Sequence, residues 1–168
     1  MEQAFQDFLM SVPAEEQAFV VDLDALLKEH QYEYSIQTAK NGYMVSYFKK
    51  VAKKKMTLIN FVFRKTGVKI RIYAGNVAKY QSFLDTLPEK MKAEIVKAGD
   101  CKRLFDPTAC NSRCQMGFAF VMDGAEYKKC RNMAFMPTLC EENDKYIKDF
   151  LCYELKEVDE YCNSLKDN

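Results

Sequence analysis

The order of apolar and polar residues predicts two helices at the start of the chain. Phe5, Phe8 and Leu9 share one face of a helix over residues 2–10. Ser11 is expected to be the N-cap of a second helix, with Pro13 in its first turn. Apolar residues at helical spacing carry this second helix to about His30.

After His30 the apolar period changes from that of a helix to that of a strand. Residues 32–36 alternate, and Asn41-Gly42, a strong hairpin signal, precedes a return strand over residues 43–50. Residues 56–65 are apolar on both faces, which is typical of a central strand. Thr66-Gly67 then turns the chain into an alternating strand over residues 68–73. The pattern therefore predicts a four-stranded antiparallel meander.

The second half of the chain is predicted to return to helices around one further hairpin. A helix is expected after Gly75-Asn76 and another from Pro88 to Gly99, followed by a loop over residues 100–116. Strands over 118–122 and within 127–136 would flank an Asp123-Gly124 turn, and a capping box at Thr138–Glu141 would begin a helix reaching about Leu165. The whole chain, residues 1–168, is thus predicted to be a single α+β domain. Its antiparallel sheet has five to six strands, with the N- and C-terminal helices covering one face.

The composition indicates a globular protein that stays in the cytoplasm. The first residues include no basic segment followed by an apolar core, which a secretory signal requires. No stretch approaches the roughly 18 apolar residues of a membrane helix. Without export, the seven cysteines are expected to be reduced thiols.

Charge is strongly segregated although the net charge is only +1. Between Tyr34 and Leu84 there are nine lysines and two arginines but no acid, whereas both termini are acidic. One explanation is that basic strands and acidic helices face each other. The leading functional hypothesis is a non-enzymatic binding or sensing domain whose sheet takes a small anionic or aromatic ligand. Its site would consist of Arg64, Lys69, Arg71 and Tyr73.

Nucleic acid is a disfavoured partner for this basic sheet. Tyrosines between basic residues could stack on the bases of a single strand. However, the acidic segments would repel a long polyanion, and no nucleic-acid-binding motif is present.

Four cysteines surround the segment that periodicity leaves as a loop, namely Cys101, Cys110, Cys114 and Cys130. The spacing of Cys110 and Cys114 suits one pair of zinc ligands, and Cys101 and Cys130 would complete the tetrahedron. The second hypothesis is therefore a protein-interaction module stabilised by a structural zinc ion, with a protein as its partner. A regulatory disulfide, a reactive thiol and ordinary reduced cysteines remain open alternatives. Cys162 lies on the apolar stripe of the last helix and is expected to be a core residue.

Few residues favour an enzyme. His30, the only histidine, is expected at a helix C-terminus, where the dipole favours a cation; a Cys–His pair would require it to meet a cysteine in space. Nucleophile-elbow, HExxH and phosphate-loop motifs are absent from the sequence. The third hypothesis is a small enzyme that uses an activated Cys110 or Cys114.

Four short blocks resemble a group of small uncharacterised bacterial proteins. They are Gly42-Tyr-Met-Val-Ser-Tyr47, Cys101-Lys-Arg-Leu104, Cys110-Asn-Ser-Arg-Cys114 and Tyr127-Lys-Lys-Cys-Arg131. The similarity covers roughly residues 30–155. It implies a bacterial cytoplasmic protein and supplies no activity.

Overall fold

The computed structural model describes residues 2–165. The chain forms two compact units. Unit 1 comprises Met1–Ile72 and Pro137–Asn168, and unit 2 comprises Tyr73–Met136. This α+β architecture confirms the predicted fold class, whereas the single domain stays a prediction. Within the described residues, no helix has the length and apolar character needed to cross a membrane.

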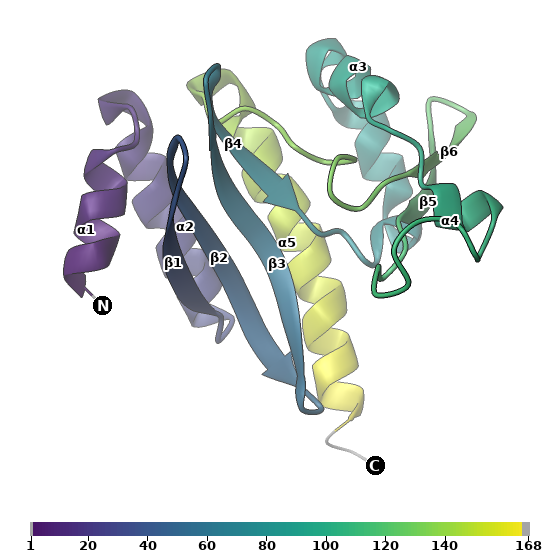
Figure 1. Ribbon diagram of the computed structural model, residues 1–168, viewed down its shortest axis with the longest axis horizontal. Helices are drawn as coiled ribbons and strands as arrows, with labels where there is room; N and C mark the ends of the chain where they lie inside the picture. Colours follow the sequence, from purple (N-terminus) through teal and green to yellow (C-terminus); the bar gives the residue numbers. More distant parts are fainter. Residues whose placement is uncertain (1, 166–168) are drawn as a thin grey trace. The chain divides into compact units, whose positions relative to one another are not determined.

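Unit 1 is built on the predicted four-stranded antiparallel meander, in the order β1-β2-β3-β4 (Figure 1). The first hairpin turns at Lys40-Asn41, so Gly42 is the first residue of the return strand. Gly42 has a φ of 135°, and a Cβ atom there would lie 2.8 Å from the ring of Phe63. Both properties favour glycine at this position. The strands are β1 (Glu33–Ala39), β2 (Gly42–Val51), β3 (Lys54–Arg64) and β4 (Gly67–Ile72).

The helices of unit 1 cover one face of this sheet, as predicted. The rings of Phe8 and Phe61 lie 5.3 Å apart, and the Tyr47 hydroxyl donates to Asp24 Oδ1 at 2.8 Å. Figure 1 shows α2 and α5 behind the sheet. The buried residues of this face alternate along the strands, as a half-buried sheet requires: Val45, Tyr47, Ile59, Phe61, Ile70 and Ile72. The helices are α1 (Glu2–Met10), η1 (Ala14–Glu16), α2 (Gln17–Glu29) and α5 (Glu141–Ser164).

The outer edge of β4 is covered by the segment that leads into α5. The amide of Ile70 donates to the Pro137 carbonyl at 3.0 Å, and the amide of Leu139 donates to Val68 at 2.8 Å. Thr138 forms an isolated antiparallel bridge with Lys69. Pairing of this kind protects an edge strand from association with other chains.

Two predicted helix starts are wrong. The N-cap of α5 is Cys140 and makes no side-chain cap hydrogen bond, because Thr138 lies on the edge of β4. Ser11 is not the N-cap of α2; its hydroxyl donates to the Asp7 carbonyl, and the 3₁₀ turn η1 precedes α2. At the other end of α2 the prediction is confirmed, because His30 is the C-cap.

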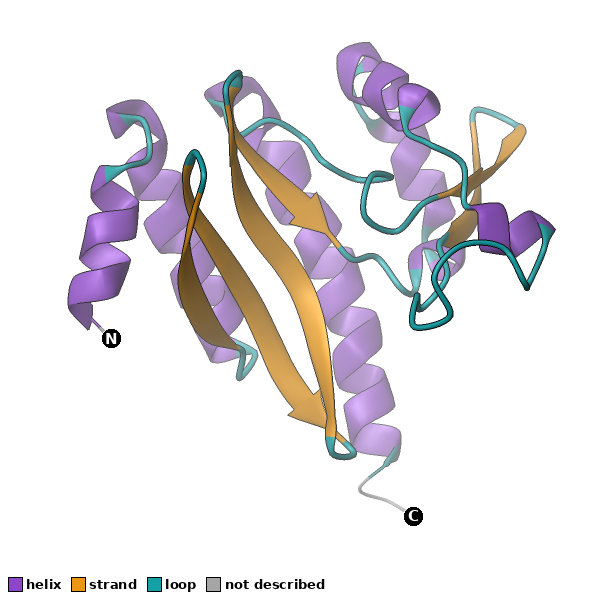
Figure 2. Cartoon of the chain, viewed as in Figure 1, coloured by secondary structure: helices purple, strands orange, loops and turns teal. Residues whose placement is uncertain are grey.

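Unit 2 contains the second predicted hairpin, which forms a sheet of its own (Figure 2). The predicted turn at Asp123-Gly124 is confirmed, and both residues have positive φ angles. The helix expected after Asn76 is instead a pair of 3₁₀ turns. The elements are η2 (Val77–Lys79), η3 (Gln81–Thr86), α3 (Glu89–Lys97), α4 (Lys102–Phe105), β5 (Phe118–Met122) and β6 (Ala125–Lys129).

Candidate functional site

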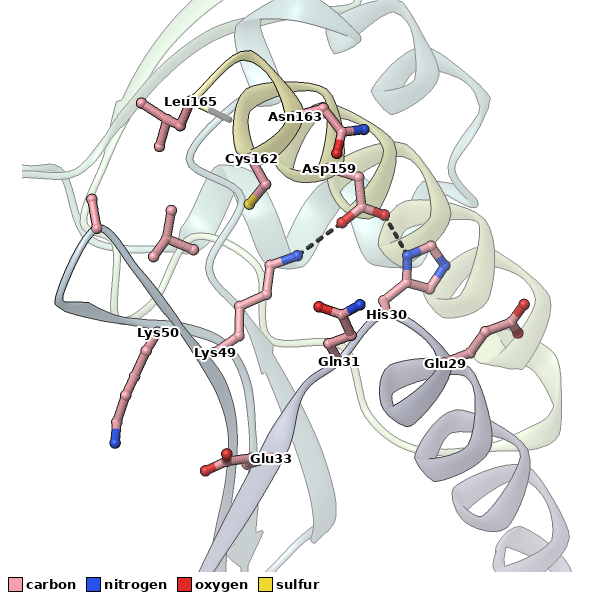
Figure 3. A pocket seen from close by; sticks show the side chains of 12 residues that line it. Glu29, His30, Gln31, Glu33, Lys49, Lys50, Asp159, Cys162, Asn163 and Leu165 are labelled. Atoms are coloured by element: carbon pink, nitrogen blue, oxygen red, sulfur yellow. Dashed lines mark hydrogen bonds and ion pairs between the residues drawn. The ribbon is translucent and has the colours of Figure 1, made fainter. Parts of the chain in front are cut away.

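A pocket with a volume of about 770 Å³ lies at one end of unit 1 (Figure 3). The C-terminal ends of α2 and α5 form part of its wall, and the start of β1 and the end of β2 form the rest. We call it the helix-end pocket. Its volume lies in the range of small-molecule sites in proteins. It is lined by Glu29, His30, Gln31, Glu33, Lys49, Lys50, Val51, Ala52, Asp159, Cys162, Asn163 and Leu165.

Asp159 joins three elements across this pocket. Its Oδ2 lies 2.5 Å from Nδ1 of His30, and its Oδ1 accepts a hydrogen bond from Nζ of Lys49 at 2.8 Å. Burial alone would raise the pKa of Asp159, but the hydrogen bonds and charges of Lys49 and His30 outweigh burial and lower it. Asp159 is therefore ionised at neutral pH, where a carboxylate can only accept. Nδ1 of His30 must carry the proton, which leaves Nε2 for another partner.

Lys49 is the most enclosed charged group on the pocket wall. Its side chain is 10% exposed, and its Nζ lies 5.0 Å from the centroid of the Tyr32 ring. Burial, followed by the nearby Asp159, Glu154 and Cys162, raises the pKa of Tyr32, which therefore stays a neutral phenol. An ammonium group has three donor hydrogens, so the bond to Asp159 leaves donors for a ligand.

Two carboxamides add neutral polar groups to the pocket. The side chains of Gln31 and Asn163 both line it, one from the end of α2 and one from the last turn of α5 (Figure 3). Neither side chain is held by a hydrogen bond within residues 2–165. Each carboxamide offers both donors and an acceptor.

Cys162 does not form a catalytic pair with His30. In Figure 3 its sulfur points toward the Lys49 side of the pocket, while the His30 ring lies beyond Asp159. The prediction that Cys162 is a core residue is wrong, because the side chain is half-buried and lines the pocket. Cys162 lies in the last turn of α5, beyond Val158, which is the last buried residue of the helix.

The backbone at the rim of the pocket adopts left-handed conformations at residues other than glycine. Gln31 has a φ of 63°, and the turn between β2 and β3 places Ala52 at 46° and Lys53 at 65°. Gln31 ends α2 in a Schellman motif, since the amide of Tyr32 bonds to Leu27 and that of Gln31 to Lys28. Such positions cost energy for L-residues and cluster at functional sites.

The predicted anion site is divided between the two units. The strand register places Arg64, Lys69 and Arg71 on the same face of the β3–β4 hairpin, opposite the helices. Arg64 is exposed, and Nε of Arg71 is buried without a hydrogen-bond partner among the described residues. Tyr73 begins unit 2, where its ring lies 5.0 Å from the guanidinium of Arg131.

The four cysteines of the predicted zinc site all lie in unit 2 as free thiols. Cys101 is buried, and its sulfur accepts a hydrogen bond from the Gly117 amide at 3.1 Å. Cys110 is exposed, whereas Cys114 and Cys130 are half-buried. Between residues 2 and 165, no three Cys, His, Asp or Glu side chains are grouped so that they could hold a metal ion. The zinc site stays a prediction without support from this geometry.

Sequence reasoning did not single out Lys49 or Asp159. The only signal was the complementary charge of the basic strands and the acidic last helix, of which this ion pair is one instance. The two residues are 110 positions apart, so no local motif connects them.

Comparison with protein-family models, with curated proteins and with solved structures finds no match to the chain. The resemblance to small bacterial proteins gains no support from these comparisons.

Proposed function

We propose that the chain is a small-ligand-binding domain and that its ligand occupies the helix-end pocket. The observation that carries this proposal is the Lys49–Asp159–His30 chain of contacts on the wall of a pocket of about 770 Å³. The side chain of Lys49 is largely withdrawn from solvent, and a pocket with a few convergent polar groups is the usual form of a ligand site.

The lining favours a compact ligand with one polar acceptor group and an apolar body. Lys49 has donor hydrogens beyond the one bound by Asp159, and they suit a carboxylate or a carbonyl oxygen. Val51, Ala52 and Leu165 provide apolar contact. The carboxamides of Gln31 and Asn163 can orient further polar atoms of the ligand.

A second candidate position for an anion is the β3–β4 face. Nε of Arg71 is buried with no hydrogen-bond partner within residues 2–165, and Arg64 lies on the same face. An unpaired guanidinium nitrogen favours a carboxylate or phosphate. We rank this position below the helix-end pocket because Arg64 is exposed, whereas the side chain of Lys49 is largely enclosed.

Three probes that differ only in the polar group test the proposal: benzoate, benzamide and benzylamine. Backbone amide NMR shifts would be recorded during titration of each probe into the full chain. We expect benzoate to shift the amides of Gln31, Ala52 and Asn163 more strongly than benzylamine does. Lys49→Met should weaken binding at least tenfold.

Lys40→Met is the matched control, because Lys40 is exposed in the turn between β1 and β2 and does not line the pocket. It should leave benzoate binding unchanged, and so should Arg71→Ala. If Arg71→Ala abolishes binding and Lys49→Met does not, the ligand occupies the β3–β4 face instead. Absence of shifts around the pocket with all three probes at millimolar concentration would refute the proposal.

A further inference from the structure

Glu16 is a buried carboxylate that binds the first turn of α5. The residue is 4% exposed and ends the η1 turn. Its Oε1 accepts a hydrogen bond from the Glu141 amide at 3.0 Å. The N-cap residue Cys140 makes no side-chain hydrogen bond to the start of α5. Glu16, from a distant part of the chain, instead accepts from one of the backbone amides that have no partner within the helix.

Two carboxylate oxygens at this junction have no hydrogen-bond partner. They are Oε2 of Glu16 and Oδ1 of Asp144, and both atoms are buried. Asp144 follows Glu141 by three positions, so the two lie on the same side of α5. The side chains of Glu16 and Asp144 are close enough to form a hydrogen bond with each other, which requires one of the two carboxylates to carry a proton.

A carboxylate disfavours the ionisation of a second carboxylate beside it, so the pKa of one of the two is raised unless a positive charge lies between them. The charged groups that act on Asp144 are Glu16 from η1 and Glu141 from α5 itself, and neither is basic. A bound metal ion would need more ligands, and the described chain contains no group of three such side chains. The positive dipole at the start of α5 further disfavours a cation.

We propose that Glu16 and Asp144 share one proton, which binds the start of α2 to the start of α5. The proton converts two unpaired acceptors into a donor–acceptor pair, and one carboxylate remains to accept from the Glu141 amide. Carboxyl pairs of this type titrate as a unit.

The shared proton makes this junction stronger in acid. Burial first, and then the charges of Glu16 and Glu141, raise the pKa of Asp144 from 3.8 to about 6. Because this folded-state pKa lies above the unfolded value, the folded state holds the extra proton between these two pH values. The stabilisation is therefore complete below about pH 4 and is lost as the pH rises through about 6. At pH 8 the start of α5 is held less firmly than at pH 5.

Carboxyl NMR titration of the full chain tests the proposal directly. The Asp144 side-chain ¹³C resonance should titrate near pH 6. An Asp144 carboxyl that titrates near its ordinary value would overturn the proposal. This measurement needs no substitution and therefore does not depend on a variant that folds.

Thermal unfolding of matched variants provides a second test. Asp144→Asn supplies an amide donor to Glu16 at every pH. It should therefore raise the melting temperature at pH 8 by about 2–6 °C and reduce the fall in melting temperature between pH 5 and pH 8. Glu142→Gln removes an exposed neighbouring charge and should keep the wild-type pH dependence. Equal pH dependence in wild type and Asp144→Asn would contradict a shared proton. If calcium chloride alone raises the melting temperature of the wild type at pH 8 to its value at pH 5, a cation occupies the position and the proposal fails.

Discussion

Replacing Lys129 by methionine should destabilise unit 2. This lysine lies on β6, and its side chain caps the C-terminal end of helix α3. The residue is 7% exposed, and its Nζ donates to the carbonyls of Val96 and Ala98, each at 2.9 Å. A third donor hydrogen reaches Asp100 Oδ1 at 2.8 Å. All three donors of the ammonium are thus used, two of them on carbonyls at the helix C-terminus, where a cation also suits the dipole.

The three contacts do not contribute equally. Asp100 is 64% exposed, so water replaces the lysine there and the loss is within about 1 kcal/mol. Each carbonyl loses a hydrogen bond to a charged donor, worth about 1.5–3 kcal/mol before water recovers part of it. Methionine keeps the apolar stem in place, which limits the cavity that the substitution leaves. The expected total is about 3 kcal/mol, or a melting temperature lower by about 6–12 °C for a chain of this size.

Lys128→Met is the control because it removes the same charge one position earlier. Lys128 is exposed, and its Nζ lies 5.0 Å from the ring of Phe105, a contact worth about 0.5–1 kcal/mol. Urea unfolding followed by far-ultraviolet circular dichroism would give both free energies of unfolding. If Lys129→Met costs no more than Lys128→Met, the carbonyl bonds do not hold the end of α3 and the reasoning is refuted.

Three further substitutions test other parts of unit 1 by the same unfolding assay. Tyr47→Phe removes the hydroxyl that donates to buried Asp24 and should cost about 1–2 kcal/mol; a neutral result would show that water replaces the bond. Gln31→Gly relieves a φ of 63° and should stabilise the chain by about 0.5–1 kcal/mol; an unchanged free energy of unfolding would show that the backbone at Gln31 is not strained. Asp159→Asn should cost about 1 kcal/mol at pH 7, since the carboxylate is 36% exposed. Because the folded-state pKa of Asp159 is lowered, wild type should lose this advantage as the pH falls through that value, and parallel wild-type and variant curves would contradict the assignment.

The strands of unit 1 were predictable because their signal is local. Apolar alternation sets which face of each strand is buried, and the turns between strands are too short to permit other registers. The last helix was predictable for the same reason, since its apolar stripe runs from Ile147 to Val158.

The helix starts and the pocket were not predictable from local patterns. Thr138 has the spacing of a capping box, but pairing with the edge of β4 removes it from the helix, and Glu16 supplies a cap 125 residues away in sequence. His30 and Asp159 are separated by 129 positions. These long-range contacts arise from the tertiary packing of α5. The sequence around either residue of a pair does not indicate which distant residue it will contact.

The covered edge of β4 also bears on the order of folding. The chain leaves unit 1 after Ile72 and returns at Pro137, where the Ile70 amide meets the Pro137 carbonyl at 3.0 Å. Closing an unfolded loop over this interval costs about 3–4 kcal/mol in chain entropy. If unit 2 folds first, its own structure brings the two ends together and removes most of that cost. The docking of α5 should then be fast only after unit 2 is formed, although α5 packs on a sheet that precedes it in the chain.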